Sequence, residues 1–140
     1  MATEQMKIRA SQSGESKAVR LQAYERLILL CERLNLQSLM LRLNSSDMNA
    51  GQLQSALLIS IQKEFEHNFT QQIYVSGQLW DMLNLLKDNL MATVSGAYSQ
   101  SQGDKQKFEE LLIESSRTID GTITKKVREG IRKEVELYFI

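Results

Sequence analysis

The chain has 140 residues and no proline, and its seventeen basic residues are matched by seventeen acidic ones. This length suffices for one domain around a single core and is too short for two. Because the formal net charge is zero, the charge of the whole molecule gives no reason to expect nucleic acid, an anionic membrane or an acidic substrate as a partner.

Residues 1–16 are rich in Ser, Gln, Glu, Lys and Gly, and such a composition cannot offset the entropy lost on ordering. We therefore expect a mobile leader over 1–16, followed by a single helical domain over 17–140. A helix is predicted from about Lys17 to Leu34, because apolar residues recur there at helical spacing. These residues are Leu21, Tyr24, Leu27, Ile28, Cys31 and Leu34.

The one cysteine, Cys31, follows three large aliphatic residues, so we predict a buried hydrophobic side chain rather than a nucleophile or ligand. A single cysteine forms no disulfide within the chain, which suits a reducing compartment. No apolar run approaches the roughly 18 to 20 residues of a membrane span, and Met1–Ala10 lacks the apolar block of a signal peptide. We expect a soluble, cytoplasmic protein.

After Asn35, a short apolar stripe precedes the polar turn at 44–47, and a short helix or a continuation of the first helix fits it equally well. The stripe consists of Leu36, Leu39, Met40 and Leu43. Asn49 and Gln52 then have the spacing of a capping box, which predicts a helix start at Asn49. The predicted core face of that helix contains Leu53, Leu57, Leu58, Ile61, Phe65 and Phe69.

Residues 71–76 include Ile73, Tyr74 and Val75, which favour extended backbone, so we expect a brief extended link. Ser76 is predicted to cap the next helix, which has the widest apolar face in the chain and should end near Gly96 and 99–103. This face contains Leu79, Trp80, Met82, Leu83, Leu86, Leu90, Met91 and Val94.

Asp104 can cap a further helix that carries Phe108, Leu111 and Leu112. Residues 118–124 alternate around Asp-Gly as a β-hairpin does, but Ile119, Ile123 and later aliphatic residues continue a four-residue ladder. We favour a helix with a break at Gly121 and a last helix over 122–138, and the hairpin remains the alternative. The predicted fold is an all-α bundle of four to five helices.

Residues 22–94 resemble an uncharacterised bacterial family, known mainly from the Bacteroidota, for which no activity is established. The resemblance rests on the strings AYERL (23–27), LRLN (41–44), LQSALL (53–58), EFEHN (64–68) and QQIYVS (71–76), together with Trp80. Members often look as if they carry an N-terminal membrane-spanning segment. If such an anchor is missing from this chain, the resemblance implies a protein that is tethered to the inner membrane.

Glu64 and His67 have the Glu-x-x-His spacing that di-iron bundles use on inward-facing helices. Such a site needs two of these units, and the chain has one histidine, so we expect no metal, cofactor or catalytic site. An enzyme using Glu64, Glu66 and His67 is the third-ranked hypothesis. Neither a nucleophile elbow nor a phosphate-binding glycine loop is present in the sequence.

Asn68 and Gln72 fall inside the apolar arc of Leu57, Ile61 and Phe65 if the helix continues that far. Inward-facing amides need partners, and the backbone of 73–76 is the nearest candidate. We therefore predict a structural polar lock rather than a binding site. Its members are Glu64, His67, Asn68, Gln72 and Ser76.

The C-terminal helix carries a local excess of positive charge at Lys125, Lys126, Arg128, Arg132 and Lys133. A solvated helix face explains it better than a ligand site, because no aromatic residue is interleaved to stack on bases. The first hypothesis for function is a non-enzymatic interaction or scaffold module that associates with itself, since Leu85 and Tyr138–Ile140 offer surplus apolar surface. The alternative is binding of RNA or anionic lipid through the basic helix.

Overall fold

The computed structural model describes the backbone of residues 2–139 and the side chains of residues 16–139. Within this part of the chain there are six α-helices and no strand, so the all-α prediction is confirmed, with more helices than the four or five expected. The helices are α1 (Ala2–Arg33), α2 (Leu36–Leu43), α3 (Ala50–His67), α4 (Gly77–Ser101), α5 (Lys105–Ile119) and α6 (Lys125–Phe139). A 3-10 helix, η1 (Phe69–Tyr74), precedes α4, and a π-helical turn, η2 (Asp120–Thr124), joins α5 to α6.

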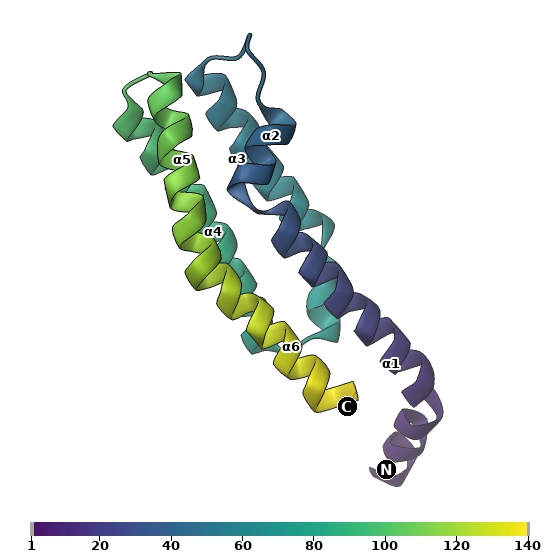
Figure 1. Ribbon diagram of the computed structural model, residues 1–140. Helices are drawn as coiled ribbons and strands as arrows, with labels where there is room; N and C mark the ends of the chain where they lie inside the picture. Colours follow the sequence, from purple (N-terminus) through teal and green to yellow (C-terminus); the bar gives the residue numbers. More distant parts are fainter. Residues whose placement is uncertain (1, 140) are drawn as a thin grey trace.

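The helices form an elongated bundle in which α4 packs against α3 and α5, and α1 packs against α6 and η1. Figure 1 shows α5, η2 and α6 following one another along nearly one line. The two ends of the chain lie at the same end of the bundle, where α1 extends past the other helices. The first and last helices therefore meet far from the turn between α2 and α3.

Helix starts follow the caps that the sequence predicts. The Asn49 side chain accepts from the Gln52 N–H while the Gln52 side chain accepts from the Asn49 N–H, which is the reciprocal capping box. Ser76 caps α4 and Asp104 caps α5 in the same way, each through the N–H three residues on. Asn35 is a cap that the sequence analysis missed: it accepts from the Ser38 N–H, so α2 is a separate short helix.

One hydrophobic core runs the length of the bundle and contains most of the predicted apolar faces. Leu53, Leu57, Ile61 and Phe65 of α3 are buried, as is nearly the whole predicted face of α4. The prediction for Phe69 is wrong, since its side chain is 55% exposed. The reason is that α3 ends at His67, and the tighter winding of η1 changes the period on which the prediction relied.

Three predicted boundaries differ from the structure. Helix α1 begins at Ala2 rather than near Lys17; the mobility expected for 1–16 stays a prediction, since the side chains of 1–15 lie outside the described part. The link at 71–76 is mostly 3-10 helix, and only Val75 and Ser76 are extended. Helix α4 continues through Gly96 to Ser101, and the chain turns at Gln102 and Gly103, both of which have positive φ.

Residues 118–124 are helical, so the hairpin alternative is wrong, and Gly121 does not break the helix. The Thr122 hydroxyl donates to the Thr118 carbonyl oxygen at 2.7 Å within the wide π-helical turn. This turn lets Ile119 and Thr124 both face the interior before α6 continues with buried Val127. Continuity of the apolar ladder therefore outweighs the local preference of Asp-Gly for a turn.

Leucines two positions apart on α4 give a matched test of the core. Leu83 is fully buried, whereas Leu85 is 60% exposed, as the sequence predicts for the opposite side of the helix. We expect Leu83→Ala to lower the free energy of unfolding by about 2 to 5 kcal/mol through lost burial and a cavity. Leu85→Ala should change it by less than about 0.5 kcal/mol. Urea denaturation of both variants checks the pair, and equal losses would contradict this packing of α4.

Candidate functional site

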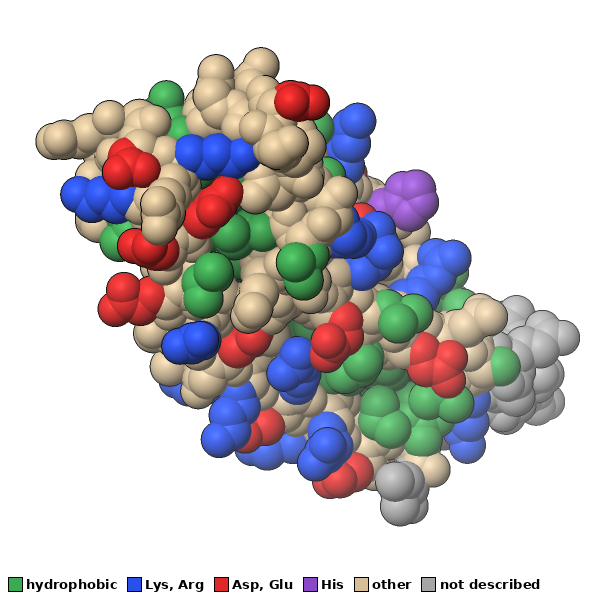
Figure 2. Space-filling view, turned by 45° about the horizontal axis from the view of Figure 1, so that its top comes forward, with side chains coloured by type: hydrophobic (Ala, Val, Ile, Leu, Met, Phe, Trp, Pro, Cys, Tyr) green, Lys and Arg blue, Asp and Glu red, His purple; other side chains and the backbone are tan. Residues whose placement is uncertain are grey.

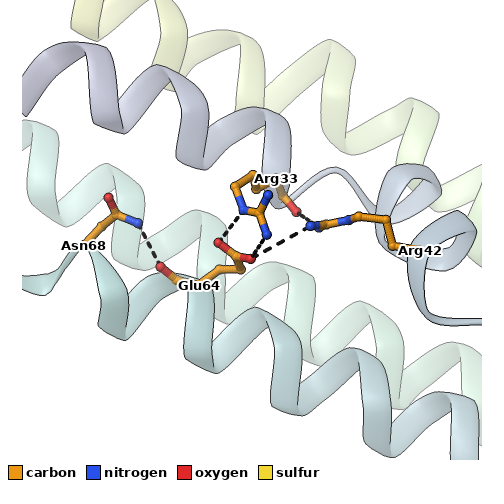
Figure 3. A network of polar contacts seen from close by, with 4 residues as sticks. All are labelled: Arg33, Arg42, Glu64 and Asn68. Atoms are coloured by element: carbon orange, nitrogen blue, oxygen red, sulfur yellow. Dashed lines mark hydrogen bonds and ion pairs between the residues drawn. The ribbon is translucent and has the colours of Figure 1, made fainter.

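Glu64 of α3 is the centre of a polar network that joins three helices (Figure 3). Arg33, at the end of α1, donates from Nε to Glu64 Oε2 at 2.7 Å and from Nη2 to Glu64 Oε1. Arg42 of α2 donates to the Arg33 carbonyl oxygen at 3.0 Å, and its Nη1 lies 3.9 Å from Glu64 Oε1. The network holds the end of α1 and helix α2 against α3.

The ion pair changes the acid–base properties of Glu64. The hydrogen bonds from Arg33 hold the pKa of the Glu64 carboxyl below its usual range, against a smaller opposing effect of burial. The same bonds raise the pKa of Arg33. Glu64 is therefore a charged partner of two arginines, and it is committed to them rather than available as a general acid.

The predicted polar lock does not form as expected. Asn68 donates to the Glu64 carbonyl oxygen at 2.9 Å, and Gln72 donates to the Phe69 carbonyl oxygen at 3.1 Å, so neither amide bonds the backbone of 73–76 (Figure 3 shows Asn68). His67 is exposed, and Glu64 and Ser76 belong to different networks. The expected partners are wrong because α3 stops at His67, which turns Asn68 and Gln72 away from the face assumed for a longer helix.

A second polar centre, missed by the sequence analysis, lies at Glu134 of α6. Its carboxylate accepts from the Ser76 N–H at 3.1 Å, from the Ser76 hydroxyl at 2.7 Å and from the Tyr24 hydroxyl at 3.0 Å. We name Tyr24, Ser76 and Glu134 the Glu134 junction. It fastens α1, the start of α4 and α6 together.

The junction also affects Tyr24, whose ring is buried against Phe139. Burial, followed by the hydrogen bond to Glu134, raises the pKa of Tyr24 to about 12. The phenol therefore remains a neutral donor at physiological pH. No spacing in the sequence connects Tyr24, Ser76 and Glu134, because the contacts span 58 and 110 positions.

Next to the junction, the terminal groove opens between α1, η1 and the end of α6, with a volume of about 670 Å³. Its lining is formed by Ser16, Val19, Arg20, Ile73, Tyr74, Val75, Ser76 and Tyr138. Arg20 donates from Nε to the Tyr74 carbonyl oxygen at 3.4 Å, and its guanidinium lies 4.4 Å from the centre of the Tyr138 ring. Apolar and polar side chains thus share the lining of the groove, and Arg20, the one cation among the lining residues, already has contacts.

The basic residues predicted as a patch are spread over α6 and partly paired. Arg128 donates to Glu32 of α1 at 2.8 Å. Lys126 and Lys133 flank a smaller hollow that Glu129 and Glu134 also line, while Lys125 and Arg132 are exposed. Binding of RNA or anionic lipid by these residues stays a prediction.

Cys31 is buried as predicted, and burial raises the pKa of its thiol to about 11. Over the residues whose side chains are described, no three His, Cys, Asp or Glu side chains gather closely enough to hold a metal ion. Glu66 accepts from Gln62 instead of meeting Glu64 and His67 in a cleft. No helix in the described part of the chain combines the length and apolar character that crossing a membrane requires.

A family model described as a family of unknown function, DUF7935, matches residues 1–138. The chain belongs to this family. The match includes the residues of both the Glu64 network and the Glu134 junction. It spans far more of the chain than the resemblance over 22–94. No curated protein and no solved structure is detectably similar to the chain. The N-terminal membrane segment implied by the resemblance stays a prediction.

Removing the charge at the Glu134 junction should destabilise the fold. Glu134→Gln removes the negative charge and replaces one of the two acceptor oxygens that the junction uses with an NH2 donor, so we expect the free energy of unfolding to fall by about 1 to 3 kcal/mol. Glu136→Gln, on the exposed side of the same helix, should change it by less than about 0.5 kcal/mol. Urea denaturation compares the two variants, and equal effects would contradict a stabilising junction.

The same variant has a spectroscopic signature, measured by tyrosinate absorbance against pH. The pKa of Tyr24 should move from about 12 toward 10 in Glu134→Gln, while burial keeps it raised. Because the pKa of Tyr24 is higher in the folded state, its contribution to stability is complete below about pH 10 and is lost as the pH rises toward 12.

The Glu64 network predicts an acid-sensitive contribution to stability. Glu64→Gln should cost about 0.5 to 1 kcal/mol at neutral pH, since Arg33 is half exposed and solvent screens the pair. The folded-state pKa of Glu64 is lowered, so this contribution exists above about pH 4.3 and disappears as the pH falls through the lowered value. Urea denaturation at neutral and acid pH should show the difference from wild type vanish in acid. A stability difference that persisted at acid pH would mean that the loss in Glu64→Gln does not come from the ion pair with Arg33.

Proposed function

We propose that the protein is a non-enzymatic interaction module that associates with a second copy of itself through the terminal groove. The observation that carries this proposal is the apolar surface at the groove. Val19, Ile73 and Tyr138 line it and are exposed, and Ile73 is 72% exposed although it lies in an ordered 3-10 helix. Large exposed apolar side chains that gather at one place favour an association surface.

Self-association is favoured because the same end of the molecule carries both a hollow and projecting side chains. Ile73 projects at the groove, and Leu137, one residue before Tyr138, is 75% exposed. A contact related by two-fold symmetry uses one patch on both copies, so this patch must offer projections and hollows together. Figure 2 shows hydrophobic side chains gathered toward this end of the bundle, between charged residues.

The polar groups of the groove also favour binding over catalysis. Arg20 is held by the Tyr74 carbonyl oxygen and the Tyr138 ring, and the Ser76 hydroxyl donates to Glu134 while capping α4. A nucleophile or general base needs a free lone pair beside a partner that activates it. These side chains already serve in packing and helix capping.

Sedimentation and light scattering over a concentration series test the proposal. We expect a dimer that dissociates on dilution, and Ile73→Lys should weaken it by at least about tenfold, because burying a charge in place of an aliphatic side chain opposes association. Leu85→Lys is the matched control, since Leu85 is also largely exposed but lies on α4 away from the groove lining. It should leave the dimer unchanged.

Circular dichroism of each variant verifies that the helices remain folded. A wild-type protein that stays monomeric at the highest concentration would refute self-association. A dimer weakened equally by Ile73→Lys and Leu85→Lys would refute the groove as its interface.

A further inference from the structure

Basic side chains gather beside the one carboxylate of the Glu64 network. Arg33, Lys63, Glu64 and His67 line a hollow of about 340 Å³, and Arg42 Nη1 lies 3.9 Å from Glu64 Oε1. We name these five residues the cationic hollow. Figure 2 shows the chain's single histidine on the surface, with Lys and Arg side chains gathered beside it.

Positive charge in the cationic hollow exceeds what Glu64 neutralises. Arg33 takes both carboxylate oxygens, and Arg42 is a second, more distant partner of one of them. Lys63 and His67 form no ion pair with any described side chain. The next acid along α3, Glu66, accepts from Gln62.

The two guanidinium groups are held in place but retain free donors. Arg33 uses Nε and Nη2 on Glu64, and Arg42 uses Nη2 on the Arg33 carbonyl oxygen. A guanidinium has five N–H donors, so each arginine keeps several for a further acceptor. An anion that binds here does not have to order the arginines first, which lowers the entropic cost of binding.

Helix ends account for part of this charge. Helices α1 and α3 both end beside the hollow, at Arg33 and His67, and cations near a helix C-terminus are stabilising. At the end of α1, the hydrogen bond from Arg42 to the Arg33 carbonyl oxygen places such a cation on a terminal carbonyl group. Lys63, one turn before the end of α3, bonds no terminal carbonyl group and remains as surplus charge.

We propose that the cationic hollow binds a phosphate group, carried by a small phosphorylated molecule or by a phospholipid headgroup. A phosphate offers several acceptor oxygens in a tetrahedral arrangement, and these can accept from the remaining N–H donors of Arg33 and Arg42 and from the Lys63 ammonium group. The hollow is open and its arginines are partly exposed, so binding is of modest affinity and weakens with salt. This site lies apart from the terminal groove, and its binding does not depend on self-association.

The single histidine gives a site-specific reporter. Proton NMR of the His67 imidazole during titration with inorganic phosphate and with pyrophosphate should show a saturable shift. Sodium chloride at the same ionic strength should not reproduce it. Identical responses to phosphate and chloride would refute the site, because general screening would then explain them.

Lys63→Gln is the decisive variant, since Lys63 is exposed and forms no ion pair with any described side chain. It should weaken phosphate binding about tenfold, the loss expected for one charge-assisted hydrogen bond. Lys107→Gln removes the same charge from an exposed position on α5 and should leave the affinity unchanged. Equal weakening by both variants would mean that phosphate responds only to overall charge, which would overturn the proposal.

Vesicle sedimentation separates the two sources of phosphate. Phosphatidylcholine vesicles with and without phosphatidic acid present the phosphomonoester on a membrane. Co-sedimentation of the protein that requires phosphatidic acid and is reduced in Lys63→Gln assigns the site to a lipid headgroup. Pyrophosphate binding without co-sedimentation assigns it to a soluble ligand. Failure of both the titration and the vesicle assay would refute the phosphate site.

Discussion

The Glu134 carboxylate is the interaction on which the arrangement of the bundle most depends. A helix N-terminus leaves its first N–H groups without partners, and α4, the helix with the widest buried face, begins at Ser76. Ser76 satisfies one of these groups itself, and Glu134 in turn binds the backbone and hydroxyl of Ser76. Tyr24 adds α1 to the same carboxylate. Because a negative charge is favourable at a helix N-terminus, one residue of α6 both positions α4 and complements its dipole.

The Glu134 junction shares Ser76 with the terminal groove at this end of the molecule. Arg20 and Ser76, two of the polar residues that line it, make contacts within the chain, while Val19, Ile73 and Tyr138 are exposed. Burial of these three apolar side chains by a partner would therefore leave the contacts of Arg20 and Ser76 in place. The cationic hollow differs from the groove, because its lining consists of charged and basic side chains.

Features encoded within one helical turn could be predicted from the sequence. The caps at Asn49, Ser76 and Asp104 were predicted because a cap and its partner stand three residues apart. The buried faces of α3 and α4 followed from a constant period. Prediction failed at Asn68 and Gln72, where the period itself changes as α3 gives way to η1. A change of helix type depends on tertiary packing, which no local pattern contains.

Contacts between residues far apart in the sequence could not be predicted from local patterns. These contacts decide which charged side chains are paired and which remain unpaired at the surface. Charge density along the chain predicts a basic patch on α6, where Lys and Arg residues cluster in the sequence. In three dimensions Arg128 is paired with Glu32, and acids share the hollow beside Lys126 and Lys133. The surplus charge instead collects from α1, α2 and α3, which supply Arg33, Arg42 and Lys63 separately. Local charge density along a sequence is therefore a poor guide to the field at a folded surface.

Helix α1 contributes to both candidate surfaces, through Arg20 at the terminal groove and Arg33 at the cationic hollow. At 1.5 Å per residue these positions lie roughly 20 Å apart along the helix axis, and they point to different sides of it. Coupling between two sites requires an element with two alternative arrangements that both ligands bias. The stretch of α1 between them is one uninterrupted helix, fixed by Tyr24 to Glu134 and by buried Leu27, Leu30 and Cys31 to the core. Because this segment is anchored along its length, we expect occupancy of one proposed surface to leave the affinity of the other unchanged.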